Sequence, residues 1–377
     1  MVRINSINRA LPGSIGGEAE LASWIEAWST KQGFAVLRLP VEDQCDQLLI
    51  CYELASDLPW LLMDSHLDTV AVEGMTIDPF GGASRAGRVW GRGSADTKGT
   101  GAAMLWALKR YANSGQGLNN VAVLLSVDEE VTMQGIRSFV DRDLPNLGWR
   151  PAAAVVGEPT ELRTVVAHNG CLRWDITTHG KACHSSVPHE GVSAISVMTR
   201  VIALFEEHYI PSLDAEHVLT GRAVCSINMI RGGSAPNIIP ASCHIVVDRR
   251  TVPGESVEQI DSKLREMLSQ LRLDESSSRI NVEVQLDQPP LGTAHNQAWA
   301  AKVTETLNEL SWSTLQLGAP FATNAAHLDA VGIPTVVIGP GSPHTAHTAD
   351  EWVEIDQIRR GVDLYHRLMI GTLPERG

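Results

Sequence analysis

The sequence lacks the features that mark membrane-spanning, secreted and thiolate-metal proteins. No apolar run approaches the roughly 20 residues that a membrane-spanning helix requires, and the N-terminal segment has no apolar stretch of signal-peptide length. The six cysteines are scattered at positions 45, 51, 171, 183, 225 and 243, and none forms a C-x-x-C pair. We therefore expect a cytoplasmic protein with free thiols and without a zinc–thiolate site.

Positive charge is also scarce. The 377 residues include 30 Lys and Arg against 44 Asp and Glu, which gives a formal net charge of −14. An acidic surface repels phosphate backbones and anionic lipid headgroups, so neither nucleic acid nor a membrane is expected as a partner. Solubility is the simplest reason for the acidity, although a cationic substrate is compatible with it.

The sequence also lacks a phosphate-binding loop. The Gly-rich segment 91–99 ends in Asp96-Thr97-Lys98-Gly99 and leads into a predicted helix. It lacks the G-x-x-x-x-G-K-[ST] spacing with which a P-loop cradles phosphates, so that interpretation is set aside. The composition, 44% hydrophobic and 20% charged, is that of an ordinary globular protein long enough for two domains.

Both ends of the chain alternate helices with short apolar strands. Amphipathic or apolar helices are predicted over 17–31 and 97–111. Strands are predicted at Leu58–Met63, Asn120–Val127, Ala152–Val156 and Ile333–Ile338. Nearly continuous apolar strands between helices indicate a mostly parallel sheet that is covered by helices on both faces. We therefore predict an α/β catalytic domain.

The middle of the chain follows a different pattern. Its predicted elements are a strand over 171–178, a helix over 192–208, strands over 223–230 and 243–249, a helix over 256–271 and a strand over 280–286. The order β-α-β-β-α-β is the ferredoxin-like one. We predict that residues 1–170 and 290–377 form the catalytic domain and that residues 171–289 form an inserted α+β lid or dimerisation domain.

Acidic residues and histidines stand directly after the predicted apolar strands. They are His66, Asp68, Glu129, Glu130, Glu158 and His347. Open α/β sheets bind ligands in the crevice outside the carboxyl ends of their strands, and Asp96 of the Gly-rich loop can reach the same crevice. Imidazole and carboxylate donors without thiolates suit Zn²⁺, Co²⁺ or Mn²⁺. Five candidate ligands, one of them bridging, suit two ions about 3.5–4 Å apart.

Each of these signals also has an ordinary explanation. His66 or Asp68 can cap a helix, and the adjacent Glu129 and Glu130 can form a solvated pair. Glu158 and His347 can be loop residues. Taken singly, each residue favours the ordinary explanation, whereas their joint placement at strand ends favours a metal centre without assigning individual roles.

The same residues stand in motifs that resemble the M20 metallopeptidases. This family includes acetylornithine deacetylases, succinyl-diaminopimelate desuccinylases and glutamate-releasing carboxypeptidases. The motifs occur in family order at 65–70, 91–99, 128–130, 157–160, 180–186, 236–240 and 347–351. They extend over nearly the whole chain, and as a set they are highly specific.

The resemblance implies how the metal ions are held. His66 and Glu158 match the ligands of one ion, and Glu130 and His347 match the ligands of the other. Asp96 matches the carboxylate that bridges them. Zn²⁺ is the expected ion, with Co²⁺ or Mn²⁺ as alternatives.

The resemblance also implies catalytic roles. Asp68 matches the carboxylate that orients a ligating histidine, as ligating histidines generally require. Glu129 matches the general base that takes a proton from the metal-activated water and later protonates the departing amine. His184 matches a histidine of the inserted domain that reaches the neighbouring subunit's site in a homodimer and steadies the oxyanion. A simple surface histidine is the alternative for His184.

Two substrate contacts are implied in the inserted domain. Asn237 matches a residue that contacts the tetrahedral centre. Arg250 matches an arginine suited to binding a substrate carboxylate. For Arg250 the alternative is a structural ion pair with Asp248 or Glu255.

The C-terminal motifs most resemble the acetylornithine deacetylase branch. Relatives in that branch often carry an acidic residue where this chain has Thr323-Asn324-Ala325. Thr323 and Asn324 are predicted substrate contacts, but the missing charge weakens the case for ornithine and leaves neutral N-acyl amino acids open. A Gly-Gly-Thr stretch typical of desuccinylases is also missing.

The predicted function is metal-dependent hydrolysis of a small-molecule N-acyl amino acid. A dipeptidase, carboxypeptidase or desuccinylase on the same scaffold is the first alternative. A catalytically silent metal-binding or scaffolding protein is the second, and the presence of all five candidate ligands and of Glu129 argues against it.

Overall fold

The computed structural model describes residues 1–271, 278–292 and 295–374. The chain divides into two compact units. Unit 1 comprises Met1–Val166, Gly292–Gly318 and Thr323–Gly377, and unit 2 comprises Ala167–Leu291 and Ala319–Ala322. Unit 2 thus interrupts unit 1 in the sequence. Among the described residues, no helix is long and apolar enough to cross a membrane.

Unit 1 is built on an eight-stranded sheet with the order β1-β2-β6-β3-β7-β18-β8-β17. The strands are β1 (Ala35–Leu39), β2 (Gln47–Tyr52), β3 (Trp60–His66), β6 (Asn120–Ser126), β7 (Pro151–Val156), β8 (Thr164–His168), β17 (Gln316–Ala319) and β18 (Thr335–Val337). The central pairs β6–β3, β3–β7 and β7–β18 are parallel, and antiparallel pairs flank them. The predicted α/β class is confirmed, with parallel pairs at the centre of the large sheet.

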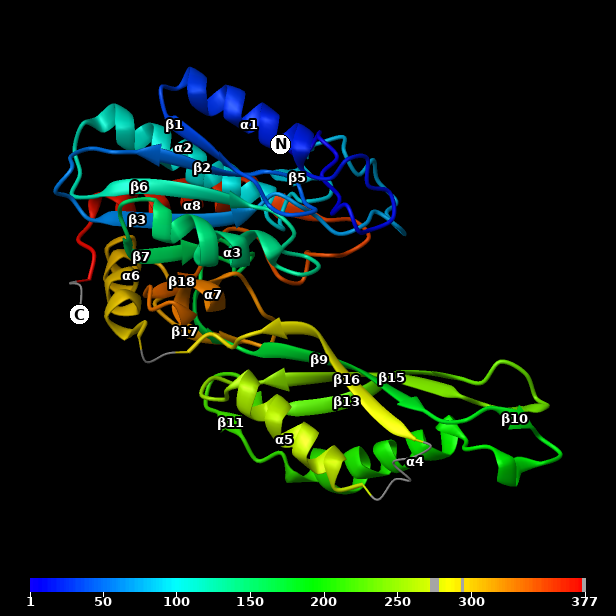
Figure 1. Cartoon of the computed structure of the whole chain (residues 1–377). Coiled ribbons are helices and arrows are strands. Elements are labelled where there is room, and N and C mark those ends of the chain that lie inside the picture. The colour runs from blue at the N-terminus through cyan, green and yellow to red at the C-terminus, as the bar shows by residue number, and fades with distance from the viewer. Residues whose placement is uncertain (272–277, 293–294, 375–377) are drawn as a thin grey trace. The chain divides into compact units, whose positions relative to one another are not determined.

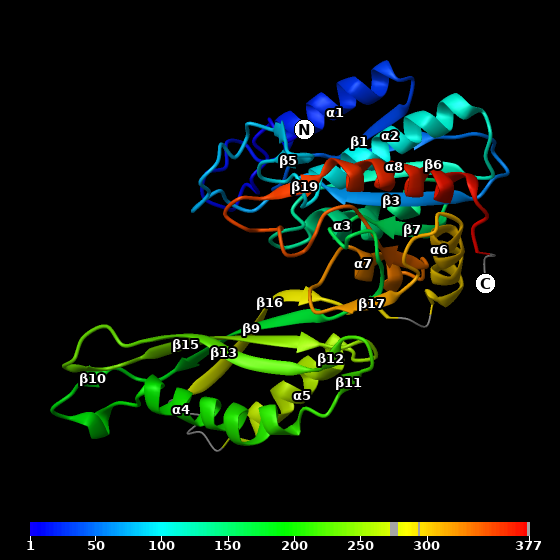
Figure 2. The same ribbon diagram turned by 180° about the vertical axis from the view of Figure 1, so that it is seen from behind.

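Helices cover this sheet. They are α1 (Ala19–Lys31), α2 (Lys98–Ser114), α3 (Gln134–Ser138), α6 (Gln297–Glu309), α7 (Ala325–Ala330) and α8 (Ile355–Ile370). Figure 1 shows α3 in front of the sheet, and the view from behind shows α8 on its other side (Figure 2). Every residue of β3 and β6 is buried, as expected for strands covered on both faces. Each buried Leu or Val of these strands contributes about 1.5–3 kcal/mol.

A small three-stranded sheet lies beside the Gly-rich loop. It consists of β4 (Ala83–Arg85), β5 (Arg88–Trp90) and β19 (Trp352–Glu354), in the order β19-β5-β4. Trp352 pairs with Trp90, and the backbone N–H of Gly91 donates to the carbonyl of Glu351 at 3.0 Å. This sheet therefore joins the segment after His347 to the loop that carries Asp96.

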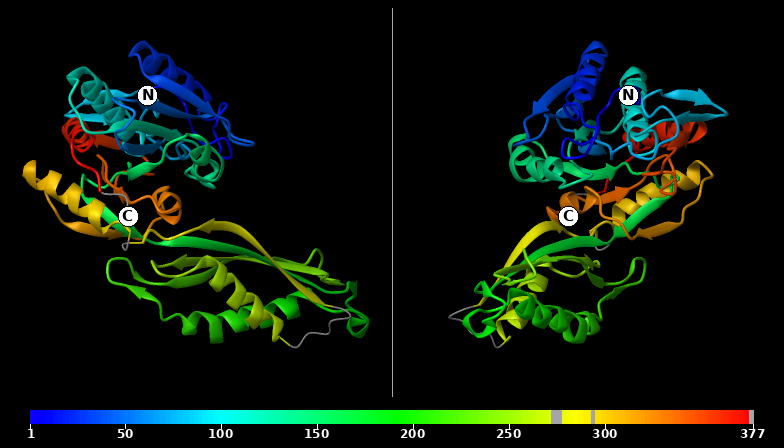
Figure 3. Two further views of the ribbon diagram at one scale, coloured as in Figure 1. Left: turned by 60° about the vertical axis from the view of Figure 1, so that its left-hand side comes forward. Right: turned by 90° about the vertical axis from the view of Figure 1, so that its right-hand side faces the viewer.

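Unit 2 contains a four-stranded antiparallel sheet with the order β13-β15-β9-β16. Its elements are β9 (Gly170–His179), α4 (Ala194–Leu204), β13 (Val224–Gly232), β15 (Ser242–Thr251), α5 (Val257–Ser269) and β16 (Arg279–Gln288). Both helices lie on one face of the sheet (Figure 3), where Trp174 packs edge-on against Tyr209. The element order is the predicted β-α-β-β-α-β, whereas a lid or dimerisation role stays a prediction.

One predicted helix of unit 2 has different bounds. The apolar pattern predicted a helix over 192–208, but α4 begins at Ala194 because the Ser193 side chain caps it by accepting from the N–H of Ser196. After Leu204 the chain continues as a π-helical turn, Phe205–Tyr209, which buries Phe205 and Tyr209 together. Aromatic packing has thus altered the end of the helix.

Candidate metal centre

Three adjacent parallel strands deliver the candidate residues to one edge of the unit 1 sheet. Strand β3 ends at His66, which is paired in register with Ser126 at the end of β6. Strand β7 ends at Val156, which is paired with Asp64. The residues that follow β6 and β7, including Glu129 and Glu158, therefore emerge beside His66, as the strand-end argument predicted.

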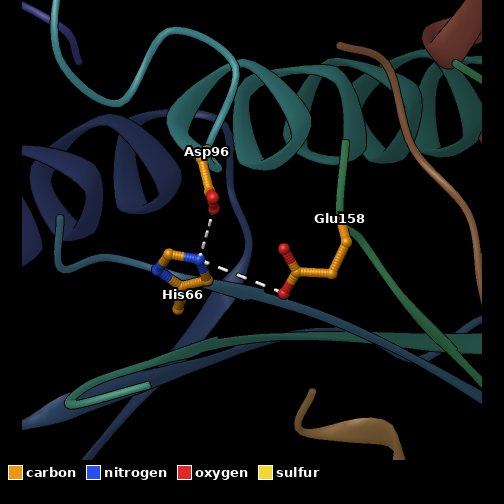
Figure 4. Close-up of side chains that lie close together, drawn as sticks. All are labelled: His66, Asp96 and Glu158. Carbon is orange, nitrogen blue, oxygen red and sulfur yellow. Dashed lines mark hydrogen bonds and ion pairs between the residues drawn. The ribbon is translucent and has the colours of Figure 1, made fainter. Parts of the chain in front are cut away.

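His66, Asp96 and Glu158 form the first group of donor atoms. His66 Nε2 lies 3.0 Å from Asp96 Oδ1 and 4.0 Å from Glu158 Oε1. Figure 4 shows the carboxylates directed toward the His66 ring, one from the loop before α2 and one from the segment after β7. Their ligand atoms lie within 4.8 Å of one another, which is compact enough to hold a metal ion.

Asp96, Glu130 and His347 form the second group, which meets the same criterion. His347 Nε2 lies 3.2 Å from Asp96 Oδ2 and 3.1 Å from Glu130 Oε2. Asp96 thus turns one oxygen toward His66 and the other toward His347. A carboxylate shared in this way is the arrangement that a two-metal centre needs.

Asp68 fixes the orientation of His66 and of the turn after β6. His66 Nδ1 lies 3.0 Å from the backbone carbonyl oxygen of Asp68 and 3.3 Å from its Oδ1, which leaves Nε2 facing the donor group. The backbone N–H groups of Glu129 and Glu130 each donate to the Asp68 carboxylate at 3.1 Å. Asn8 Nδ2 donates to Asp68 Oδ2 at 2.9 Å. Asn8 was not predicted as a site residue. It lies outside every motif, so nothing in the sequence indicates its contact with Asp68.

Glu129 and its acidic neighbours are buried close together. Burial raises the pKa of Glu129 well above its ordinary value, and the charges of Glu130, Asp68 and Asp96 raise it further. Burial likewise raises the pKa of Glu130 and Glu158. A raised pKa makes a carboxylate a better proton acceptor, which suits a general base.

The charge balance of the centre fits a divalent cation. Hydrogen bonds to Asp96 and Glu130 raise the pKa of His347 to about 11, which shows how strongly this position favours positive charge. Clustered buried carboxylates are costly unless a cation compensates them. The donor atoms are imidazole nitrogens and carboxylate oxygens, which suit Zn²⁺, Co²⁺ or Mn²⁺.

The two predicted substrate contacts of unit 1 are buried. Asn324 is 1% exposed and Thr323 is 2% exposed. Asn324 Nδ2 donates to Asp64 Oδ2 at 2.9 Å and to Ser126 Oγ at 3.0 Å. The amide of Asn324 therefore bonds internally, to the ends of β3 and β6, and a substrate contact for either residue stays a prediction.

The other three predicted residues lie in unit 2. His184 is exposed on the short ribbon of β10 (Cys183–His184) and β14 (Ile238–Ile239), where it pairs with Ile238. Asn237, also exposed, precedes that strand. Arg250 Nε lies 2.8 Å from Asp248 Oδ1, which is one of the two ion pairs considered above as the alternative for this arginine.

Comparison with known proteins places these observations in a family context. Residues 62–371 match the model of peptidase family M20/M25/M40. The chain is 31% identical over 358 residues to the acetylornithine deacetylase of Proteus mirabilis, covering 93% of this chain and 88% of the relative.

Two solved structures show the same fold. One is the M20 family metallo-carboxypeptidase Sso-CP2 from Sulfolobus solfataricus, with a TM-score of 0.77 and 16% identity over 98% of this chain and 96% of that one. The other is the YXEP protein of Bacillus subtilis, a dinuclear metal-binding peptidase, with a TM-score of 0.72 and 15% identity over 98% and 94% of the two chains.

Proposed function

The chain belongs to peptidase family M20/M25/M40 and is a metal-dependent hydrolase of amide bonds; on that premise we propose that it cleaves the amide of an N-acyl amino acid. The relative from Proteus mirabilis supports this choice, since it is named as a deacetylase. The observation that carries the proposal is the pair of donor groups that share Asp96, with Glu129 buried beside them.

Five residues would hold the metal ions. We assign His66 and Glu158 to one ion, Glu130 and His347 to the other, and Asp96 to both. Divalent ions bound there polarise a carbonyl oxygen and lower the pKa of a water molecule. Zn²⁺ is the ion we propose, because two imidazoles and three carboxylates without a thiolate suit it.

Glu129 is the proposed general base. A carboxylate oxygen of Glu129 takes a proton from the attacking water, and the resulting carboxylic acid returns it to the nitrogen of the departing amine. The buried surroundings that raise the pKa of Glu129 favour the first of these transfers, from water to the carboxylate. Asp68 holds the backbone of Glu129 and the ring of His66, so one residue aligns the base with a ligand.

The substrate assignment can be tested with a panel of compounds. N-acetylornithine, neutral N-acetyl amino acids, N-succinyl amino acids and dipeptides are incubated with protein that was treated with EDTA and reloaded with Zn²⁺ or Co²⁺. We expect release of free amine from N-acetyl amino acids and loss of activity with EDTA. Preference for dipeptides would favour the peptidase alternative. Absence of both bound metal and amide cleavage would favour a silent binding protein.

We also propose a cytoplasmic homodimer in which His184 completes the site of the partner subunit. The test mixes two inactive variants, Glu129→Gln and His184→Ala, under conditions that exchange subunits. A mixed dimer contains one site with both native residues, so about a quarter of the wild-type activity should return at equal amounts. If His184 acted within its own subunit, no activity would return on mixing.

A further inference from the structure

Glu351 is a fully buried carboxylate that the metal centre as assigned above does not use. It lies four residues after His347 and immediately before β19, and its exposed fraction is 0%. A carboxylate buried in this way is stable only when hydrogen-bond donors surround it. The identity of its donors therefore indicates what it does.

The side-chain hydrogen bonds of Glu351 go to the loop that carries Asp96. Its Oε1 accepts from the backbone N–H groups of Ala95 at 2.7 Å and of Asp96 at 3.0 Å. Its Oε2 accepts from the N–H of Gly93 at 3.0 Å and from Arg92 Nη1 at 2.8 Å. One carboxylate thus gathers four donors from a short stretch of the loop.

The loop follows a path that a larger side chain would block. Gly93 has a φ of +81°, and a Cβ at that position would lie 2.8 Å from both Lys98 Cδ and Thr69 Cγ2. Successive N–H groups that point inward form a concave anion site, and here the anion is Glu351. The path of the loop, and with it the position of the Asp96 backbone, depends on this carboxylate.

We infer that Glu351 is a positioning residue that holds Asp96 in place to serve both donor groups. This inference rests on the proposed metal centre. Asp96 must present one oxygen to His66 and the other to His347, so a small rotation of the loop would spoil both groups. Glu351 belongs to the same segment as His347, and it therefore fixes the shared carboxylate relative to one of the histidines that faces it.

Asp350 offers a matched control. It is the neighbouring carboxylate, it is only partly buried, and it also accepts several bonds, from Thr76 Oγ1 at 2.7 Å and from the N–H groups of Thr76 at 3.0 Å and Ile77 at 3.3 Å. These donors lie outside the loop of Asp96. Loss of the Asp350 carboxylate therefore weakens a similar set of hydrogen bonds without touching the bridging residue.

The experiment measures Zn²⁺ affinity by competition with a chromophoric chelator, using metal-free wild type, Glu351→Gln and Asp350→Asn. The amide that Glu351→Gln introduces keeps one acceptor oxygen, so two of the four donors lose their partner. We expect Zn²⁺ binding to weaken by about 10–100-fold in Glu351→Gln, as is usual for residues that support metal ligands. Asp350→Asn should stay within about twofold of wild type. At saturating Zn²⁺ most of kcat should return in Glu351→Gln, because every proposed ligand remains.

A stability control separates positioning from general destabilisation. Leu307 of α6 is fully buried in the core of unit 1, and Leu307→Ala removes about 2–5 kcal/mol from the free energy of unfolding. We expect its Zn²⁺ affinity to equal that of wild type. If Leu307→Ala lost as much affinity as Glu351→Gln, or if Glu351→Gln bound Zn²⁺ like wild type, the positioning role would be wrong.

A milder variant covers the case in which Glu351→Gln does not fold. Arg92→Lys keeps the positive charge beside Glu351 and the three backbone bonds but loses the Nη1 donor, so its Zn²⁺ affinity should fall, but less than that of Glu351→Gln. An unchanged affinity would overturn the inference. Wild-type protein that bound no Zn²⁺ would instead reject the metal centre itself, which distinguishes failure of the proposed function from failure of the positioning role.

Discussion

Units 1 and 2 both contain polar residues that match the family motifs, but the two units differ in how deeply these residues are buried. In unit 1, Asp96, Glu129 and Glu158 are buried and their carboxylates crowd one another. In unit 2, His184 and Asn237 are exposed on a short ribbon. Burying charges costs several kcal/mol per ion unless a partner compensates them. The buried carboxylates of unit 1 therefore demand a functional explanation. Exposed polar groups, as in unit 2, cost little free energy, so their exposure alone does not indicate a function.

The largest expected effect comes from the buried base. Glu129→Gln should lower kcat by about 10²–10⁴-fold, because the amide cannot accept the proton of the attacking water. Zn²⁺ stoichiometry, measured by atomic absorption, should be unchanged. Glu283→Gln, at an exposed position of unit 2, is the matched control and should retain wild-type activity. A Glu129→Gln protein with more than about a tenth of the wild-type kcat would remove Glu129 as the base.

An exposed residue of unit 2 provides the second test. His184→Ala should lower kcat by about 10²–10³-fold if its imidazole stabilises an oxyanion. Its Zn²⁺ affinity and melting temperature should match wild type, since the side chain is exposed. His208→Ala changes another exposed histidine of unit 2 and should have no effect. Equal activities of the two variants would mean that His184 is an ordinary surface residue.

A pH titration probes a buried group of unit 2. Burial lowers the pKa of His168 from 6.5 to about 4, so the unfolded chain binds a proton more readily than the folded one below pH 6.5. The contribution of His168 to the free energy of unfolding is fully present above pH 6.5. It should fall by about 3 kcal/mol as the pH drops to 4. Urea unfolding of wild type and His168→Gln at a series of pH values measures this contribution of His168, which the variant should lack. Parallel slopes in the two proteins would contradict the assignment.

The smallest expected effect localises metal binding. At a concentration 100 times its Kd, Zn²⁺ should stabilise the protein by about 2.7 kcal/mol. Hydrogen exchange followed by mass spectrometry should show slower exchange in the segments 91–99 and 128–130 of unit 1. Peptides from β13 in unit 2 should exchange at the same rate with and without Zn²⁺. Equal protection of both units would show that the ion binds elsewhere as well.

The fold and the grouping of the candidate ligands could be predicted because burial leaves a clear pattern. Strands such as β3 and β6 are apolar along most of their length and end in polar residues, so the strand ends and the parallel centre of the sheet are visible in the sequence. The helix end at Leu204 was less visible, because aromatic packing rather than periodicity decided it.

Contacts between distant residues could not be predicted. Asn8 bonds to Asp68 and Asp128 across 60 and 120 positions, and no local pattern encodes such a pairing. Asn324 was interpreted only by comparison with acidic relatives, yet its partner is Asp64, 260 positions away. Glu351 lay inside a motif, but its role depends on the folded path of the Gly-rich loop.

The position of β18 in the sheet has a consequence for synthesis of the protein. Strands β7 and β8 follow each other in the chain, but β18, made from residues 335–337, lies between them. Until residues 335–337 have been synthesised, β7 has no neighbour on that side, and an open strand edge is prone to pair with other chains. We therefore expect chains that end before residue 335 to aggregate more readily than the full chain.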